Sequence, residues 1–301
     1  MNYKTLLKDA IGILEKNKIE DAEHDATEIL LNLLDIDMAR FLFEYEDDLE
    51  ERFEKRFISN LISDYDELIN ARASHFPLQY ILGETYFCGL KFLIDRNVLI
   101  PRQDTETLVE KVLADNPDKN KFVLDLCTGS GCIAVSLASL GDYKLVVGTD
   151  ISEEALEVAS KNAENILPDY EYDDEMLQRI YFLRSNIFDN LGKISDKLGI
   201  EKFDIITANP PYIRTSDLSN LQIEVSKYEP RLALDGDKDG LKYYRLIAKE
   251  AKKYLNDGGK IYLEIGYDQA DDVKEIFSNN GFEFVELIND LNDKNRVIVF
   301  K

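Results

Sequence analysis

The chain has 301 residues, of which 45% are hydrophobic and 32% are charged, a composition typical of one large globular domain or two ordinary ones. Its formal net charge of −23 disfavours, without excluding, a protein that binds duplex DNA or RNA, because such binding usually needs a basic face. No apolar run approaches the ~18 residues of a membrane helix, and the first residues lack the apolar core of a signal peptide, so we expect a cytoplasmic protein with neither a membrane nor a nucleic acid as a direct partner.

Residues 1–75 are predicted to form a small helical domain. In `TLLKDAIGILEKN`, apolar residues recur at helical spacing from Leu6 to Leu14, and `DAEHDATEILLNLLD` repeats this pattern after Asp21, a residue type that favours helix N-caps. A third amphipathic stretch is `FEKRFISNLISDYDELIN`. Acidic residues greatly outnumber basic ones in this segment, and no motif in it suggests chemistry of its own.

Residues 76–100 have a β-rich composition, with Gly83 and Gly89 as turn points, and predict a β-hairpin linker between two domains. After Pro101, in residues 101–301, strand and helix patterns alternate, which predicts an α/β domain whose mostly parallel sheet is covered on both faces. Strands are expected at 121–126, 144–149, 179–184, 203–208, 259–265, 282–288 and 296–300, and helices at 131–139, 152–163, 240–255 and 268–280. A short link joins the last two strands, so we expect an antiparallel strand at the sheet edge. The acidic stretch 168–176 is predicted to be a solvated loop.

A glycine turn follows the first of these strands. The stretch `VLDLCTGSGCIAVSLA` reads as a strand, a tight turn at Gly129-Ser130-Gly131, and a helix whose N-terminus offers free N–H groups. Asp150 ends the next strand, where a carboxylate can accept hydrogen bonds from both hydroxyls of a ribose. Together these features predict a site for a nucleoside-containing cofactor at the carboxyl edge of the sheet.

Two cofactors are compatible with this turn. Gly129, Gly131 and Ala134 satisfy the G-x-G-x-x-A spacing of a dinucleotide site. Asp125, at the end of the preceding strand, favours S-adenosylmethionine instead, because a carboxylate suits the ammonium and sulfonium groups of this cofactor better than a pyrophosphate.

The strand expected at 203–208 ends in Asn209-Pro210-Pro211-Tyr212. Proline donates no backbone hydrogen bond and fixes its own φ, so the strand cannot continue through this quartet. The Asn209 side-chain oxygen and the Pro210 carbonyl can each accept one N–H of a planar amino group, and the Tyr212 ring can pack on that group. The lone pair of such a nitrogen is delocalised, so two rigid acceptors that aim it at a cofactor methyl would catalyse methyl transfer without a histidine base.

No metal is expected. Cys88, Cys127 and Cys132 complete no zinc pattern, and the chain has just two histidines. The segment `DGDKDG`, from Asp235 to Gly240, matches the opening of a calcium-binding loop, but position 12 of that loop is Leu246 where glutamate is required.

Several motifs together resemble a known family. N-P-P-Y is typical of S-adenosylmethionine-dependent methyltransferases that act on adenine or glutamine amino groups. The segments `PLQYILG` (77–83), `VLIPRQDTETLVE` (98–110), `LDLCTGSGCIA` (124–134), `NPPYI` (209–213) and `YEPRLALDGDKDGLKYYR` (228–245) resemble, in this order, the peptide chain release factor glutamine methyltransferase family. The resemblance covers nearly the whole chain. It implies a Rossmann-like seven-stranded methyltransferase sheet with a small N-terminal helical domain, and S-adenosyl-L-methionine as the cofactor. It also implies methylation of the side-chain amide nitrogen N(5) of the glutamine in the Gly-Gly-Gln motif of class I peptide chain release factors.

Residue roles follow from the motif matches. The resemblance implies that the cofactor is held by Cys127, Thr128, Gly129, Ser130, Gly131 and Asp150, with Asn209 bordering it. It implies that the glutamine is held by Asn209, Pro210, Pro211 and Tyr212, of which Asn209, Pro210 and Tyr212 are the expected catalytic residues. In `RSNIFDN`, Asn186 stands before Ile187 where the family usually has an acid, and its oxygen could still bond the adenine amino group.

Two further segments have local interpretations. Pro101 is expected to open a helix on which Arg102 and Glu106 form an i,i+4 ion pair, and the resemblance places this segment beside the active site. The segment `EPRLALDG` is expected to shape the mouth of the substrate pocket, and the acidic helical domain is expected to dock the release factor.

Three alternatives stay open. An adenine-amino methyltransferase of DNA or RNA would need a basic groove or a base-reading domain, and the sequence shows neither. A ribosomal-protein glutamine methyltransferase is poorly separated by sequence from the leading hypothesis. A non-catalytic cofactor-sensing protein would be expected to have lost Asn209 or the glycine loop, and both are present.

Overall fold

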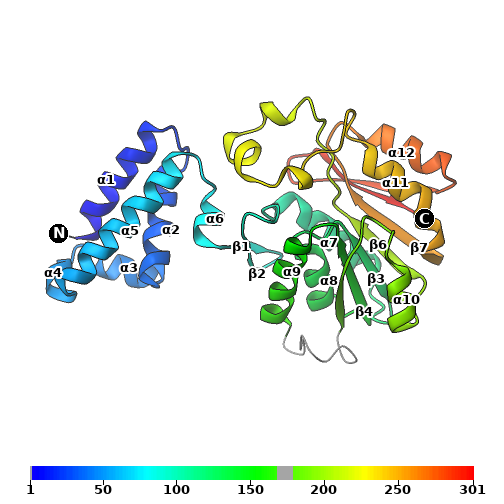
Figure 1. Ribbon diagram of the computed structural model, residues 1–301, viewed down its shortest axis with the longest axis horizontal. Helices are drawn as coiled ribbons and strands as arrows, with labels where there is room; N and C mark the ends of the chain where they lie inside the picture. Colours follow the sequence, from blue (N-terminus) through cyan, green and yellow to red (C-terminus); the bar gives the residue numbers. More distant parts are fainter. Residues whose placement is uncertain (1, 168–178) are drawn as a thin grey trace. The chain divides into compact units, whose positions relative to one another are not determined.

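The computed structural model describes residues 2–167 and 179–301 (Figure 1), so the acidic stretch predicted as a loop at 168–176 lies outside the described residues. The chain forms two compact units. One comprises Met1–Gly83 and Gln222–Tyr228, and the other Glu84–Leu221 and Glu229–Lys301. Within the described ranges, no helix combines the length and the apolar character that crossing a bilayer requires.

The first unit is helical, as predicted. Its helices are α1 (Tyr3–Lys16), α2 (Ala22–Leu34), α3 (Met38–Glu44), α4 (Leu49–Arg52), α5 (Lys55–Ala73) and α6 (Leu78–Leu82), and the short π-helix η2 (Glu224–Tyr228) belongs with them. The three amphipathic stretches of the sequence correspond to α1, α2 and α5. Their apolar stripes meet in one core, where Leu14 and Ile29 are fully buried and the Tyr65 hydroxyl donates to the Ala26 carbonyl at 2.9 Å.

The hairpin is shorter than predicted. Strands β1 (Glu84–Phe87) and β2 (Leu90–Leu93) pair antiparallel around a turn at Cys88 and Gly89, both of which have positive φ. The prediction of β structure was wrong for 78–82, which forms α6 and contributes Leu78 to the helical core. Pro77 precedes this helix and Gly83, in the left-handed conformation, ends it, so apolar composition alone misled the prediction.

The second unit contains a seven-stranded sheet of order β5-β4-β3-β6-β7-β9-β8. All seven predicted strands are present, as β3 (Phe122–Leu126), β4 (Leu145–Asp150), β5 (Ile180–Arg184), β6 (Phe203–Ala208), β7 (Leu255–Glu264), β8 (Phe284–Asn289) and β9 (Asn295–Phe300). The strands from β5 to β7 pair in parallel, whereas β9 pairs antiparallel with both β7 and β8. The expected antiparallel strand at the edge is therefore confirmed.

Helices cover both faces of this sheet (Figure 1). Val123, Val146 and Ile205 pack in one core with α7 (Gln103–Asp115), α8 (Cys132–Leu140) and α9 (Glu153–Ile166). Their neighbours in the strands, such as Leu124 and Ile206, pack in a second core with α10 (Gly192–Leu198), α11 (Lys242–Glu250) and α12 (Ala270–Asn279). Short helices η1 (Leu218–Asn220), η3 (Arg231–Ala233) and η4 (Ala251–Lys253) complete the described elements of this unit. Because both faces are buried, the parallel strands appear in the sequence as nearly continuous apolar runs.

Strand order determines where a ligand can bind. β3 lies between β4 and β6, so the chain leaves β3 toward one side of the sheet and later returns on the other side. At such a switch point, the loops after neighbouring parallel strands separate and leave a crevice at their carboxyl ends. Asp150 is the last residue of β4, and the glycine turn and Asn209 follow β3 and β6.

Candidate active site

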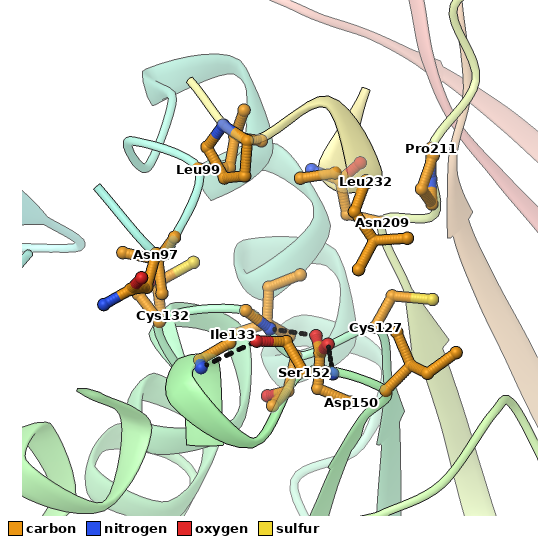
Figure 2. A pocket seen from close by; sticks show the side chains of 18 of the residues that line it. Asn97, Leu99, Cys127, Cys132, Ile133, Asp150, Ser152, Asn209, Pro211 and Leu232 are labelled. Atoms are coloured by element: carbon orange, nitrogen blue, oxygen red, sulfur yellow. Dashed lines mark hydrogen bonds between the residues drawn. The ribbon is translucent and has the colours of Figure 1, made fainter. Parts of the chain in front are cut away.

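A cavity lies at the carboxyl ends of β3, β4 and β6 (Figure 2). Of the residues predicted from the sequence, its wall includes Cys127, Thr128, Gly129, Ser130, Asp150, Asn186, Ile187, Asn209 and Pro211. Figure 2 shows Asp150 and Ser152 on one side of the cavity and Leu99, Leu232 and Pro211 on the opposite side. The sheet therefore brings together residues that are up to 84 positions apart in the printed sequence, between Cys127 and Pro211.

The glycine turn is held close to the backbone around it. The Thr128 N–H donates to the Thr149 carbonyl at 2.9 Å, which extends the β3–β4 pairing into the turn. Gly131 is the N-cap of α8 and has a φ of 78°, and a Cβ atom there would lie 3.0 Å from the Cβ of Ala159. A side chain at Gly131 is thus excluded both by backbone conformation and by packing.

Asp150 connects the glycine turn to the loop that follows β4. Its two carboxylate oxygens accept the N–H of Gly129 at 2.9 Å and the N–H of Ser152 at 3.0 Å. Burial raises the pKa of Asp150, and these N–H groups oppose that rise by stabilising the charged form. Each carboxylate oxygen keeps a further lone pair, so the group can still accept hydroxyl hydrogens from the cavity.

Asn186 also lines the cavity, and its amide is oriented by a neighbour. Its Nδ2 donates to Asp189 Oδ2 at 3.1 Å, which leaves Oδ1 as the free end of the amide. An oxygen acceptor is what an adenine amino group requires. The substitution of asparagine for the acid that is common in the resembling family therefore keeps the acceptor.

Asp125 lies away from the cavity wall, contrary to the expectation that it faces the positive charges of the cofactor. Its side chain is fully buried, and its two oxygens accept the hydroxyls of Thr128 at 2.6 Å and Thr207 at 2.7 Å. Burial raises its pKa to about 7, although both hydroxyls oppose the rise. Asp125 thus ties the end of β3 to the glycine turn and to β6.

The raised pKa of Asp125 predicts a pH-dependent effect of Asp125→Asn on stability. The neutral acid is favoured in the folded state, so its stabilising effect is complete below the ordinary pKa of 3.8 and is lost as pH rises through about 7. Asparagine has no such loss. The free energy of unfolding of the variant, relative to the wild type, should therefore increase by about 4 kcal/mol between pH 4 and pH 8. Urea denaturation across this range measures the difference. The exposed Glu157→Gln variant is the control, and a difference that is independent of pH would contradict the assignment.

The quartet Asn209-Pro210-Pro211-Tyr212 divides between the cavity and the interior. Asn209 and Pro211 line the cavity, whereas Pro210 is buried and does not form part of the cavity wall. In the described part of the chain, no hydrogen bond is directed to the Pro210 carbonyl. The Tyr212 hydroxyl donates to Glu264 Oε1 at 3.3 Å, and its ring packs with the core between the sheet and α11. The Tyr212 ring is packed in the protein core and stabilises the loop. Its position therefore does not agree with the expectation that it packs on the substrate.

Two further segments contact this quartet: Gln269, at the start of α12, and the loop that contains Gly236 and Gly240. The Gln269 side-chain amide donates to the Tyr212 carbonyl at 3.0 Å, and a Cβ atom at Gly236 would lie 2.8 Å from the Pro211 carbonyl oxygen. Gly240 approaches the Tyr212 carbonyl even more closely and has a φ of 75°. The glycines of `DGDKDG` therefore allow a close backbone approach to the quartet, which explains this motif without calcium.

Arg102 and Glu106 form different contacts from those predicted. The i,i+4 pair between them was wrong: Arg102 forms an ion pair with Glu229, and Glu106 accepts the N–H of Cys88 at 2.8 Å. Glu229 is buried and also accepts the Ile100 N–H at 3.4 Å. Burial raises the pKa of Glu229, and Arg102 opposes that rise. This pair joins the segment before α7 to the loop that brings Leu232 to the cavity.

Sequence reasoning missed part of the cavity wall. The missed residues that line it include Arg96, Asn97, Val98, Leu99, Thr105, Cys132, Ile133, Ser152, Ala155, Leu232, Ala233 and Tyr243. Val98, Leu99 and Thr105 lie within the motif at 98–110, so the motif contained a signal for them. Leu232 and Ala233 lie in the segment expected to shape the mouth of the pocket, and they do form part of its wall.

The wall fits a nucleoside-containing methyl donor. A carboxylate with free lone pairs follows β4, an amide oxygen follows β5, and the glycine turn admits close backbone approach. Asn209, whose amide is uncharged, lines the same cavity and precedes Pro210, whose carbonyl accepts no hydrogen bond from the described residues. The arrangement suits the orientation of a substrate amino group toward a bound methyl donor.

Comparisons with known proteins agree with this geometry. Residues 5–83 match the family model of the PrmC N-terminal domain, and residues 117–296 match that of a methyltransferase domain. The chain is 44% identical over 231 residues to the release factor glutamine methyltransferase of Geobacter sulfurreducens, a match that covers 77% of this chain and 75% of the relative. It is 38% identical to the release factor glutamine methyltransferase of Clostridium botulinum, over 99% of this chain and 98% of the relative. The crystal structure of the hMettl16 catalytic domain in complex with MAT2A 3′UTR hairpin 6 is similar with a TM-score of 0.51 at 17% identity, over 71% of this chain and 76% of that one, and shows a shared Rossmann-like fold alone.

Proposed function

The chain belongs to the release factor glutamine methyltransferase family, and from this premise we propose that it methylates the side-chain amide nitrogen N(5) of a glutamine, with S-adenosyl-L-methionine as the methyl donor. The proposed substrate is the glutamine of the Gly-Gly-Gln motif in class I peptide chain release factors. The observation that carries the proposal is that Asn209 lines the same cavity as the glycine turn and Asp150. The adenine-directed alternative is not favoured, because the full-length relatives are named for a glutamine substrate.

When bound, S-adenosylmethionine supplies an electrophilic methyl group. The Asn209 Oδ1 atom and the Pro210 carbonyl each accept one N–H of the glutamine amide, which increases electron density on its nitrogen and directs the lone pair into the cavity. The described wall of the cavity has no histidine. None is required, because the nitrogen can release its proton to solvent once it has acquired positive charge. The chain thus contributes to the reaction by orienting the substrate amide and by electrostatic stabilisation.

We assign the cofactor contacts as follows. Asp150 accepts the ribose hydroxyls, Asn186 Oδ1 accepts from the adenine amino group beside Ile187, and the turn from Cys127 to Ser130 provides backbone contacts. Gly131 does not line the cavity and instead caps α8. Asp125 supports this turn from within the sheet, and Tyr212 supports Asn209 and Pro210. Pro211 contributes an apolar surface to the substrate side of the cavity.

We further propose that the helical unit docks the release factor. On α3, the side chains of Phe43, Leu42 and Met38 are 86%, 64% and 42% exposed. Acidic residues surround them in the sequence, among them Asp37 and Glu46. An exposed apolar surface with an acidic border suits a protein partner whose matching surface is apolar with a basic border.

The test combines the purified protein, S-adenosylmethionine carrying a labelled methyl group, and a class I release factor. Label should appear on the release factor and be absent from a variant in which the glutamine of Gly-Gly-Gln is replaced by alanine. Ribosomal proteins and DNA are added in separate reactions. Equal labelling of both release factors, or labelling only of DNA or of a ribosomal protein, would refute the proposed substrate.

A further inference from the structure

Thr105 contacts the side chain that the proposed reaction needs most. It lies in the first turn of α7, is 2% exposed, and its Oγ1 accepts a hydrogen bond from Asn209 Nδ2 at 3.3 Å. An asparagine amide has a donor end and an acceptor end on opposite sides. A partner that accepts from the nitrogen therefore determines where the oxygen points.

The buried carboxyl of Glu264 lies beside this hydrogen bond. This residue ends β7, is 2% exposed, and its Oε1 accepts the Tyr212 hydroxyl at 3.3 Å. Its second oxygen, Oε2, is buried and accepts no hydrogen bond from the described residues. The Thr105 hydroxyl lies near enough to lower the pKa of this carboxyl, which burial raises to about 6.

A carboxylate only accepts hydrogen bonds, so the Thr105 hydroxyl can act toward Glu264 only as a donor. Its lone pairs then remain for a donor, and Asn209 Nδ2 is that donor. When the Thr105 hydroxyl donates to Glu264, donation runs in one direction, from Asn209 to Thr105 to Glu264. With the amide reversed, two oxygens would face each other at Thr105, and an N–H of Asn209 would oppose the N–H groups of a substrate amide.

We propose that Thr105 is a positioning residue, whose hydroxyl holds the Asn209 amide with its oxygen directed at the substrate amide. This inference rests on the proposed function for the identity of that substrate. Its chemistry requires an acceptor at Asn209, and the contact with Thr105 is what makes the acceptor end available. Thr105 belongs to the motif at 98–110, so this motif influences the reaction through its hydrogen bond with Asn209 in the quartet after β6.

The kinetic test compares Thr105→Val, which keeps the shape and loses the hydroxyl, with Thr105→Ser, which keeps the hydroxyl. Thr105→Val should lower kcat/KM for the release factor about tenfold, the usual effect of one oriented hydrogen bond. Thr105→Ser should stay within about threefold of the wild type, and both variants should keep the cofactor Kd and the Tm of the wild type. Activity of Thr105→Val within twofold of the wild type, or equal losses in both variants, would overturn the proposal.

A second measurement does not need the substrate. In protein labelled with ¹⁵N at asparagine, the side-chain NH₂ of Asn209 is assigned by its disappearance in Asn209→Asp. It should show nuclear Overhauser cross peaks to the side-chain protons of Thr105, and their absence would overturn the proposal. If the wild-type protein failed to methylate the release factor, the proposed function would fail, while these cross peaks would still decide the orientation of the amide.

Discussion

Replacement of Asn209 by alanine should lower kcat for methylation of the release factor by about 10²–10³-fold, the usual effect of removing one fixed hydrogen-bonding group from an active site. The Asn209 oxygen accepts from the substrate amide in the proposed reaction, and alanine leaves that amide with the Pro210 carbonyl alone. The nitrogen then lacks both the electron density and the orientation that the second acceptor gives. The cofactor Kd should change little, because the main proposed cofactor contacts come from Asp150, Asn186 and the glycine turn.

Single-turnover kinetics with labelled S-adenosylmethionine measure the rate, and titration of the cofactor measures its Kd. The matched control is Asn220→Ala, since Asn220 is exposed in the same unit and its side chain has no hydrogen bond in the described structure. A rate for Asn209→Ala within tenfold of the wild type would show that the amide acceptor is not central to the reaction. A parallel loss in cofactor affinity would show instead that Asn209 acts on the donor.

The sequence predicted the sheet well because each buried parallel strand is a short apolar run bounded by polar residues. The strands from Phe122 to Ala208 were found within one residue of the predicted ends. The residues at the carboxyl ends of these strands could then be placed at one edge by topology alone. The local sequence pattern was sufficient to predict those elements whose formation depends on local or periodic interactions.

Prediction failed where a contact between distant segments decided the outcome. Leu78–Leu82 is apolar enough for a strand, but it is a helix whose Leu78 packs in the core of the first unit. Arg102 had a possible partner four residues away, yet it pairs with Glu229, 127 positions further along the chain. A buried glutamate without a nearby cation costs more than an exposed i,i+4 pair contributes, so the distant pair prevails.

The roles of Asp125 and Tyr212 show the same limit at the site itself. Asp125 lies near the end of β3 and Tyr212 in the loop after β6, and both side chains point into the protein, toward Thr207 and Glu264 respectively. Successive side chains point to opposite faces of a strand, but the loop after the strand has no such rule. The sequence alone could therefore not predict which of the four residues in the quartet reach the cavity. The structure assigns that position to Asn209 and Pro211, and makes Tyr212 their support.

Asp150→Ala is expected to weaken the binding of S-adenosylmethionine about 10²-fold, because it removes the proposed charged acceptor of two ribose hydrogen bonds. The same substitution should also lower the stability of the folded protein. The same carboxylate accepts the N–H groups of Gly129 and Ser152, so its loss leaves both without this partner and frees the glycine turn from the loop after β4. The free energy of unfolding should fall by about 1–3 kcal/mol.

Asp150→Asn separates these two effects. An asparagine keeps one oxygen acceptor but presents an NH₂ where the second oxygen stood, so one of the two backbone N–H groups would face a donor. Its cofactor Kd and its stability should therefore both lie between those of the wild type and Asp150→Ala. Isothermal titration with the cofactor and urea denaturation measure the two quantities, with Glu157→Ala, an exposed acid on α9, as the control for the change in net charge. If Asp150→Ala bound the cofactor like the wild type, the ribose would have to be held by another acceptor of the cavity, and the proposed orientation of the methyl group toward Asn209 would lose its anchor.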